Sequence, residues 1–176
     1  MGNLAYEVFE SKTTKPDNIM KLTLDTDTQI FFYEQDFYVL SNFSAFNVDI
    51  FGRRFQTAEH AYHWRKFAGA YPTIAHAIEN STSAHNAFKL AEQHKDKLPQ
   101  NWNAVRLSFM REILREKVKQ HEYVRRKLLA TGNKEMIENS WRDDFWGWGQ
   151  NRDGKNMLGK LWMEIRTELH DAGGAS

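Results

Sequence analysis

The longest helical pattern in the chain follows Asn101 and runs to about Gln120. Apolar side chains recur along it at spacings of three, four and four residues, which places them on one face of a helix. These residues are Trp102, Val105, Phe109 and Ile113. Asn101 is of a type favoured just before a helix and is expected to cap it. The pattern predicts a long amphipathic helix and points to a mainly helical domain.

Shorter helical patterns lie on both sides of the long one. Helices are predicted over residues 58–68, 73–79, 82–97, 122–130 and 157–170. Thr57 is the expected N-cap of the first of these, and Pro99 is expected to stop the third. Extended structure is predicted for residues 29–33, for a hairpin over 46–55 and for 134–138. The predicted fold class is therefore mainly α with a small β element (α+β).

The length of 176 residues suits one domain with a sizeable core. A hydrophobic content of 41% and a charged content of 27% are globular values. No repeat or linker divides the sequence. We therefore expect a single compact domain over residues 29–170, with a flexible leader over 1–28 and a disordered tail over 171–176.

The charge balance limits the partners that the chain can attract. Lys and Arg number 24 and Asp and Glu number 23, so the net charge is +1 and no global field attracts a polyanion. The chain has no cysteine, which excludes disulfides, thiolate catalysis and cysteine-ligated zinc and favours an intracellular, cytoplasmic location. No apolar stretch approaches the length of a membrane span, so no membrane partner is expected.

The segment from Asp144 to Lys160 has an unusual composition. It contains three aromatic residues, four glycines and two asparagines together with several charges. Aromatic rings can stack on a flat ligand, and glycines let the backbone approach it closely. A helical pattern follows directly, and the N–H groups at a helix N-terminus favour anions. The segment fits either a loop that cups a flat, polar ligand or a loop that seals the core, because Trp is usually well buried.

Glu59 is the first candidate for chemistry. It lies in the first turn of the helix predicted over 58–68, where the helix dipole favours a negative charge. Its position suits an ordinary first-turn acid equally well. His60 and His63 stand three residues apart on one face of the same helix. A zinc site needs a third ligand and usually another spacing, so no metal site is expected.

Asp143 and Asp144 precede the aromatic segment. Asp is common in turns and caps, so one interpretation is structural. The functional interpretation pairs one of them with Glu59, because two carboxylates that meet across an aromatic pocket can cleave a glycosidic bond as acid and base. Asn42 is either a turn residue or an amide that binds a hydroxyl.

Basic residues flank Glu59 in the sequence. Arg53 and Arg54 precede its helix, and Arg65 and Lys66 lie near the helix end. Such residues are usually solvated, yet a cluster on both sides of an acid can hold a phosphate. The basic run from Arg111 to Lys119 is instead expected on a solvated helix face.

Several short motifs follow one another along the chain. They are Phe32-Tyr33, Ser41-Asn42-Phe43, Glu59-His60, Lys66-Phe67, Asn101-Trp102, Asp143, Trp146-Gly147-Trp148-Gly149 and Gly154-Lys155-Asn156-Met157-Leu158-Gly159. Together they cover about residues 30–169 and resemble the NADAR family, also called YbiA-like. Two positions depart from the family pattern. Trp148 stands where some relatives have a small or acidic residue, and the usual Gln near His63 is absent.

The resemblance implies an N-glycosidase, which hydrolyses the C–N bond between a ribose and a base-like amine. It implies that Glu59 is the catalytic carboxylate and that Asn42, Asp143, Trp146 and Asn156 are pocket residues. The pairing of two carboxylates described above adds Asp143 to Glu59 as a predicted catalytic residue. Together with the aromatic segment and the basic residues that flank Glu59, the predicted substrate-binding residues are Asn42, Phe43, Arg53, Lys66, Trp102, Trp146, Gly147, Trp148, Lys155 and Asn156. Trp102 is also expected to support the core, since it opens the apolar face of the long helix. No metal and no cofactor are implied.

Two substrate classes are linked to the family. One comprises the phosphoribosylamino-pyrimidine intermediates of riboflavin synthesis, and the other is ADP-ribose attached to guanine in DNA or RNA. The near-neutral charge favours the small metabolite, although a single modified base needs little electrostatic attraction. The alternative from another class is a non-catalytic module that binds ADP-ribose or a nucleotide. Such a module should tolerate Glu59→Gln, whereas an enzyme should not.

Overall fold

The structure is a computed structural model that describes residues 24–33 and 35–174. Its helices are α1 (Ala58–Phe67), α2 (Pro72–Glu79), α3 (Ala84–Gln93), α4 (Trp102–Gln120), α5 (Glu122–Leu129) and α6 (Met157–Gly174), with short 3-10 helices η1 (Gln35–Leu40) and η2 (Lys95–Lys97). The strands are β1 (Gln29–Phe31), β2 (Val48–Ile50), β3 (Arg53–Phe55) and β4 (Glu135–Ile137). The predicted class, mainly α with a small β element, is confirmed.

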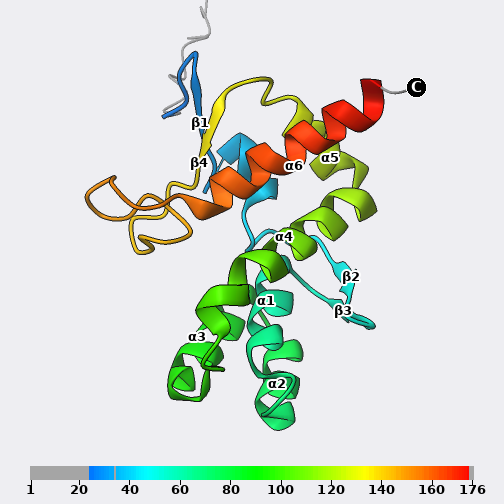
Figure 1. The fold of residues 1–176 in the computed structure, drawn as a ribbon, viewed down its shortest axis with the longest axis vertical. Coiled ribbons are helices and arrows are strands. Elements are labelled where there is room, and N and C mark those ends of the chain that lie inside the picture. The colour runs from blue at the N-terminus through cyan, green and yellow to red at the C-terminus, as the bar shows by residue number, and fades with distance from the viewer. Residues whose placement is uncertain (1–23, 34, 175–176) are drawn as a thin grey trace, which may run out of the picture.

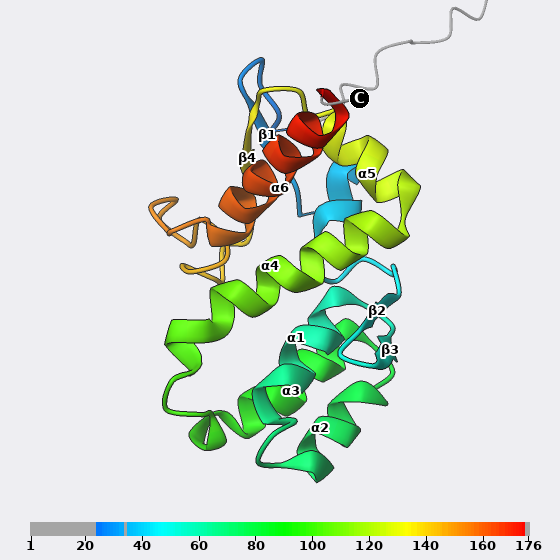
Figure 2. The ribbon, with the colours of Figure 1, turned by 45° about the vertical axis from the view of Figure 1, so that its right-hand side comes forward.

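The long helix α4 separates two groups of elements (Figures 1 and 2). Helices α1, α2 and α3 pack together on one side, next to the antiparallel hairpin of β2 and β3. Helices α5 and α6 lie on the other side with β1 and β4, which pair in parallel with Ile30 opposite Met136. The long connection between β4 and α6 extends from this second group.

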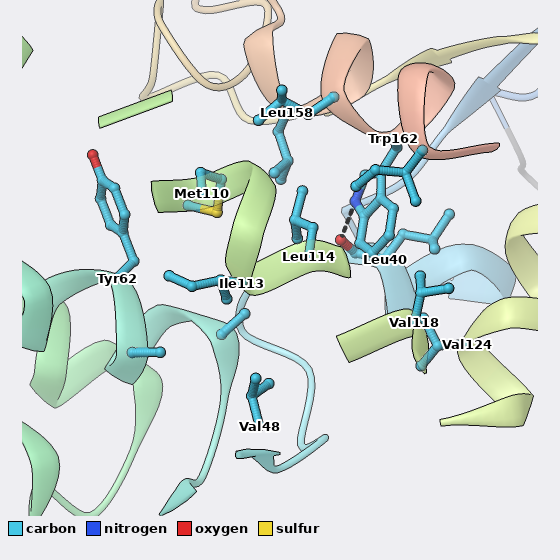
Figure 3. Close-up of a cluster of buried hydrophobic side chains, with 14 of the residues drawn as sticks. Leu40, Val48, Tyr62, Met110, Ile113, Leu114, Val118, Val124, Leu158 and Trp162 are labelled. Atoms are coloured by element: carbon cyan, nitrogen blue, oxygen red, sulfur yellow. Dashed lines mark hydrogen bonds between the residues drawn. The ribbon is translucent and has the colours of Figure 1, made fainter. Parts of the chain in front are cut away.

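The main core lies along α4, although Val105 and Phe109 of the predicted apolar face are only partly buried (Figure 3). Met110, Ile113 and Leu114 of α4 are fully buried. Trp162 of α6 is also fully buried, and its indole N–H donates a 2.8 Å hydrogen bond to the carbonyl of Leu40. This bond satisfies the one polar group of the largest core side chain.

Two helix starts differ in how they are capped. The side chain of Thr57 accepts the backbone N–H of His60, as predicted for an N-cap. Asn101 occupies the predicted N-cap position of α4, but its side chain makes no capping hydrogen bond. The carbonyl of Pro99 instead accepts the N–H of Trp102 at 2.9 Å, so a tight turn satisfies this N–H at the start of the helix. The helix predicted over 82–97 is divided into α3 and η2.

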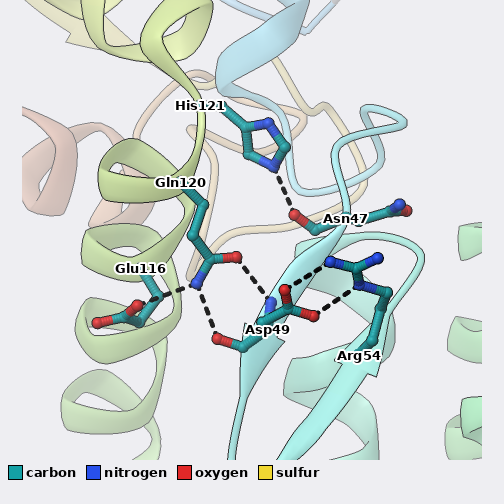
Figure 4. A network of polar contacts seen from close by, with 6 residues as sticks. All are labelled: Asn47, Asp49, Arg54, Glu116, Gln120 and His121. Carbon is teal, nitrogen blue, oxygen red and sulfur yellow. Dashed lines mark hydrogen bonds and ion pairs between the residues drawn. The ribbon is translucent and has the colours of Figure 1, made fainter.

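Polar contacts attach the hairpin to the end of α4 (Figure 4). Gln120 accepts the N–H of Asp49 and donates to its carbonyl, both at 2.8 Å. Arg54 holds the Asp49 carboxylate with two hydrogen bonds of 2.7 Å. His121 contacts the carbonyl of Asn47 at 2.5 Å. These contacts fix the hairpin that leads directly into α1.

Lys117 corrects one expectation about the basic run from Arg111 to Lys119. It is fully buried rather than solvated, and its ammonium donates to the Ser41 carbonyl at 2.9 Å and to Ser44 Oγ at 2.8 Å. Burial lowers its pKa to about 7. The sequence pattern could not show this, because the turn that covers this face of α4 comes from a distant segment.

The chain ends are more ordered than predicted where the structure describes them. Of the expected leader, residues 24–28 make contacts with β1 and β4: the Thr28 carbonyl accepts the N–H of Glu135, and Asp25 accepts the N–H of Phe31. Residues 171–174, expected in the tail, continue α6, which ends at Gly174. Residues 1–23 and 175–176 lie outside the described part. None of the described helices has the length and apolarity to span a membrane.

Candidate active site

Glu59 lies where α1 begins, on the side facing the turn at Asn42. Its backbone N–H donates to the Asn42 carbonyl at 3.1 Å, so the turn and the first turn of α1 are joined. The Glu59 side chain is buried, with 7% of the residue exposed. A carboxylate in this position is accessible only through the cavities that adjoin it.

The two histidines of α1 have different partners. His63 Nε2 lies 2.7 Å from Glu59 Oε1. Burial lowers the pKa of His63, and the neighbouring Glu59 opposes that shift. The neutral ring must then donate from Nε2, because a carboxylate only accepts. His60 instead contacts Thr57 Oγ1 at 2.8 Å and the Ser81 carbonyl at 3.2 Å, so both of its ring nitrogens are used within the fold.

Two cavities meet at Glu59. The first, of about 240 Å³, lies between α1, α3, α4 and the loop after β4. It is lined by Glu59, Tyr62, His63, Lys66, Phe88, Glu92, Leu98, Trp102, Asn103, Arg106, Asp143, Phe145 and Trp146. The second, of about 160 Å³, is lined by Tyr33, Asn42, Phe43, Glu59, His85, Phe88, Glu138, Ser140, Arg142, Asp143 and Trp146. We call them the first and second chambers.

The first chamber combines two cations with aromatic rings. The Lys66 ammonium lies 4.8 Å from the centre of the Tyr62 ring, and burial lowers its pKa to about 8. The guanidinium of Arg106 lies 3.3 Å from the centre of the Phe145 ring. The edge of Trp146 meets Tyr62 at 5.4 Å between ring centres. This chamber offers positive charge and ring faces at the same place, which suits a phosphorylated ligand with a flat group.

Asp143 borders both chambers, opposite α1. Its Oδ1 accepts the backbone N–H groups of Phe145 at 2.8 Å and Trp146 at 2.6 Å. The carboxylate thus shapes the turn that presents Trp146 to the cavities. Asp144, the other acid considered from the sequence, is exposed and lines neither chamber.

Buried polar atoms without a partner concentrate at the two chambers. Among the described residues such side-chain atoms are Asn42 Oδ1, His63 Nδ1, Arg106 Nε and Glu138 Oε2. All four residues line one chamber or the other. Because a buried unpaired polar group costs about 1–3 kcal/mol, such groups are expected to cluster where a ligand completes them.

Some residues of the aromatic loop line the first chamber, and others contact only the rest of the protein. Phe145 and Trp146 line the first chamber, whereas the Trp148 ring packs on Phe31 at 4.9 Å between ring centres. Lys155 is exposed, with its ammonium 5.7 Å from the centre of the Phe145 ring. The N–H groups of Met157 and Leu158, at the start of α6, donate to carbonyls of the loop rather than remaining open for an anion.

Two further residues of the loop hold its own backbone. Asn156 is buried, donates to the Met136 carbonyl at 2.8 Å and accepts the N–H of Glu138 at 3.0 Å. A side chain on Gly147 would place its Cβ 2.9 Å from Ser140 Cβ and 3.0 Å from the Glu138 carbonyl. A glycine is therefore required here because the loop at Gly147 packs closely against the segment from Glu138 to Ser140.

Arg53 lies away from both chambers. Its guanidinium pairs with Glu79 of α2 at 3.0 Å and lies over the ring of Trp64. Of the residues predicted for the site, the structure therefore brings seven to the chambers: Asn42, Phe43, Glu59, Lys66, Trp102, Asp143 and Trp146. Arg53, Gly147, Trp148, Lys155 and Asn156 line neither chamber.

Sequence reasoning missed four charged residues of the chambers, Glu92, Arg106, Glu138 and Arg142. Arg106 stands on α4 between Val105 and Leu107 and is half-buried, and its charge gave no sign that its Nε would be buried. Glu138 follows the three-residue strand β4, where only the tertiary arrangement turns it inward. Within residues 24–33 and 35–174, no group of three or more His, Cys, Asp or Glu side chains is arranged to hold a metal ion.

Comparison with known proteins agrees with this arrangement. The model of the NADAR domain family matches residues 31–170. The chain belongs to the NADAR family. The N-glycosidase YbiA of Escherichia coli (strain K12) is 34% identical over 145 residues, covering 81% of this chain and 89% of that protein. An N-glycosidase of Nostoc punctiforme is also 34% identical, covering 81% of this chain and 93% of its own.

Two further similarities extend the comparison to structure and to a longer protein. The NMR structure of Escherichia coli YbiA resembles this NADAR domain with a TM-score of 0.75 and 32% identity, over 88% of this chain and 92% of that one. A riboflavin biosynthesis protein of Vibrio vulnificus is 33% identical over 144 residues, which cover 81% of this chain but 39% of that protein. The NADAR domain thus also occurs as part of a longer chain.

Proposed function

We propose that this protein is a hydrolase of N-glycosyl bonds that cleaves the C–N bond between a phosphorylated ribose and an amine or base, with Glu59 as the essential carboxylate. Its relatives named N-glycosidase support the class of enzyme. The observation that carries the proposal is that Glu59 lines both cavities. The first chamber also holds the cations Lys66 and Arg106, which the second does not.

Glu59 suits the charge that develops during cleavage. Breaking a ribosyl C–N bond places positive charge on the sugar, and a fixed carboxylate stabilises that state. The Glu59 carboxylate is held by His63 at 2.7 Å and by its place in the first turn of α1. It can also take a proton from the attacking water as a general base. The sugar is therefore expected to lie between the two chambers, next to Glu59.

Lys66 and Arg106 support a phosphate in the first chamber. Both line it, and Arg106 Nε is buried without a partner among the described residues. A guanidinium forms strong, directed hydrogen bonds with phosphate oxygens. The rings of Tyr62, Trp102 and Trp146 provide an apolar wall beside these cations.

The first substrate class to test is a phosphoribosylamino-pyrimidine. The net charge of +1 offers no field to attract a nucleic acid. One relative is named a riboflavin biosynthesis protein, which points to the same class. ADP-ribose attached to guanine in DNA or RNA is the second class, since the cations and rings of the first chamber also suit a diphosphate and a base.

The deciding experiment incubates the purified protein with both substrates and follows the released base or amine by mass spectrometry. Release from the pyrimidine intermediate with none from ADP-ribosylated guanine supports the first class. The reverse result selects the second class. Tight binding of ADP-ribose without release from either substrate would instead identify a binding module and overturn the proposal.

A chelation arm tests the expectation that no metal takes part. Extensive dialysis against EDTA should leave hydrolysis intact, because His60 is committed to the fold and His63 to Glu59. Loss of turnover that zinc or magnesium restores would contradict this expectation.

A further inference from the structure

Glu138 is a buried acid that the proposed function has not used. It follows β4 and lines the second chamber, with 7% of the residue exposed. Its Oε2 is buried and has no hydrogen-bond partner within the described residues. No ion pair is formed by this carboxyl in that part of the chain either. A charged carboxylate in this situation would carry the full cost of desolvation.

The acids and bases around Glu138 come from every element that surrounds the second chamber. They are Glu59 from α1, His85 from α3, Tyr33 from the segment after β1, and Arg142 and Asp143 from the loop after β4. Burial raises the pKa of Glu138 well above its ordinary value, and the charges of Asp143 and Glu59 raise it further. Three acids at one cavity cannot all be charged at low cost, and Glu138 is the one with no compensating donor.

The backbone of Glu138 is fixed by the residues that the sequence motif singles out. Its N–H donates to Asn156 Oδ1 at 3.0 Å, and its carbonyl accepts the N–H of Trp148 at 3.2 Å. Gly147 allows the loop to approach the same carbonyl closely. Asn156 and Gly147 line neither chamber, so their contacts identify them as positioning residues that act through Glu138.

We infer that Glu138 is the general acid of the reaction: it enters the cycle as a neutral carboxylic acid in the second chamber and gives its proton to the nitrogen that leaves the ribose. This inference rests on the proposed function and adds the identity of the proton donor. It also places the leaving amine or base in the second chamber, next to Asn42, whose buried Oδ1 has no partner in the part of the chain that the structure describes.

The proton balance of the step is complete without a further reactant. As the C–N bond breaks, its electron pair goes to the nitrogen, which takes the proton from the Glu138 O–H. Water adds to the ribose carbon and gives its proton to Glu59. That proton returns to Glu138 through solvent, so the sum is one water consumed, one C–O bond formed and one N–H bond formed.

The test compares two leaving groups with Glu138→Gln. A phosphoribosylamino-pyrimidine needs a proton on its leaving nitrogen, whereas nicotinamide leaves nicotinamide mononucleotide as a neutral ring without one. The amide keeps the shape of the neutral acid but cannot transfer a proton. Glu138→Gln should therefore lower kcat on the pyrimidine substrate by ~10²-fold or more and leave kcat on nicotinamide mononucleotide within a factor of a few.

Two variants make the result specific. Glu135→Gln is the same substitution in the same strand, on an exposed side chain that contacts Gln29, and it should change neither rate. Glu138→Asp keeps an acid at a shorter reach and should recover part of the rate on the pyrimidine substrate. A Glu138→Gln protein that loses both rates equally, or neither, would show that Glu138 is structural.

The wild-type pH profile gives an independent readout. Because Glu138 must be protonated, kcat/KM on the pyrimidine substrate should fall as pH rises through its raised pKa, and this limb should be absent with nicotinamide mononucleotide. Lys66 titrates as well, but it affects both phosphorylated substrates alike. The same limb on both substrates would overturn the inference while leaving the proposed function intact, whereas hydrolysis of no ribosyl amine at all would remove both.

Discussion

The chambers at Glu59 and the contacts between the hairpin and α4 use the same kinds of residue in opposite ways. In the contacts of Figure 4, the side chains of Asp49, Arg54 and Gln120 form hydrogen bonds at the surface. At the chambers, Asn42, Arg106 and Glu138 each have a buried polar atom without a hydrogen-bond partner among the described residues. One region satisfies its polar groups within the fold, and the other leaves them unpaired, as expected of the ligand site that we propose.

This difference separates stability from function. A surface ion pair such as Asp49 with Arg54 contributes little, because water and salt screen it. Buried unpaired groups lower stability, and a protein retains them where they do chemistry or bind a ligand. Substitutions of the polar groups at the chambers are therefore expected to change turnover strongly and stability weakly, whereas those in the surface contacts should change turnover little.

The largest effect is expected for Glu59→Gln. The amide keeps the size of the side chain and removes the charge that stabilises the ribosyl cation, so turnover should fall by at least ~10²-fold. The fold should persist, as judged by circular dichroism and melting temperature. Glu116→Gln, in the contacts of Figure 4, is the matched control and should leave turnover unchanged. A folded Glu59→Gln protein with normal turnover would remove Glu59 from its role.

Two tryptophans at the first chamber should respond differently to truncation. Trp102 is 5% exposed and stacks on Phe109 at 5.9 Å between ring centres, so Trp102→Ala should cost about 3–5 kcal/mol of stability. Trp146 is only half-buried, at the end of the turn shaped by Asp143. Trp146→Ala should mainly weaken substrate binding and turnover. Melting temperature and KM should be measured for both variants. A large stability loss in Trp146→Ala together with a change of KM alone in Trp102→Ala would contradict this assignment.

Lys117 sharpens the comparison, because it is as buried as the groups of the chambers yet donates to Ser41 and Ser44. Its pKa falls from 10.5 in the unfolded chain to about 7 in the fold. Between these values the unfolded state binds more protons, so the free energy of unfolding should rise with pH, by up to ~1.4 kcal/mol for each pKa unit.

The Lys117 effect can be isolated with Lys117→Met. The wild type should gain stability relative to this variant between pH 7 and pH 9. Urea unfolding at each pH measures the free energy of unfolding of both proteins. Lys66, whose pKa is lowered to about 8, contributes in the same direction but is present in both proteins. Parallel pH profiles for the two proteins would mean that Lys117 is not the titrating group.

The sequence predicted what depends on local pattern and missed what depends on tertiary packing. Thr57 and Glu59 were placed correctly at a helix start because capping and dipole effects act within one turn. Glu138 and Lys117 were not recognised as buried, because the segments that cover them are distant in sequence. The aromatic loop was only partly foreseen: Trp146 lines a chamber, but Trp148 packs on Phe31 because β1 lies beside the loop.

The smallest effect is expected for Arg53→Gln. As a basic residue that flanks Glu59 in the sequence, Arg53 was expected to help bind substrate, yet it pairs with Glu79 at the surface, where its side chain is 48% exposed. Such a pair contributes about 0–1 kcal/mol, so melting temperature should change slightly and KM not at all. Arg106→Gln is the matched control: it removes the same charge from the first chamber, where its Nε is buried and unpaired, and should raise KM for a phosphorylated substrate. If Arg53→Gln raised KM as much as Arg106→Gln, the substrate would have to extend beyond the chambers to the hairpin, and the separation between the two regions would fail.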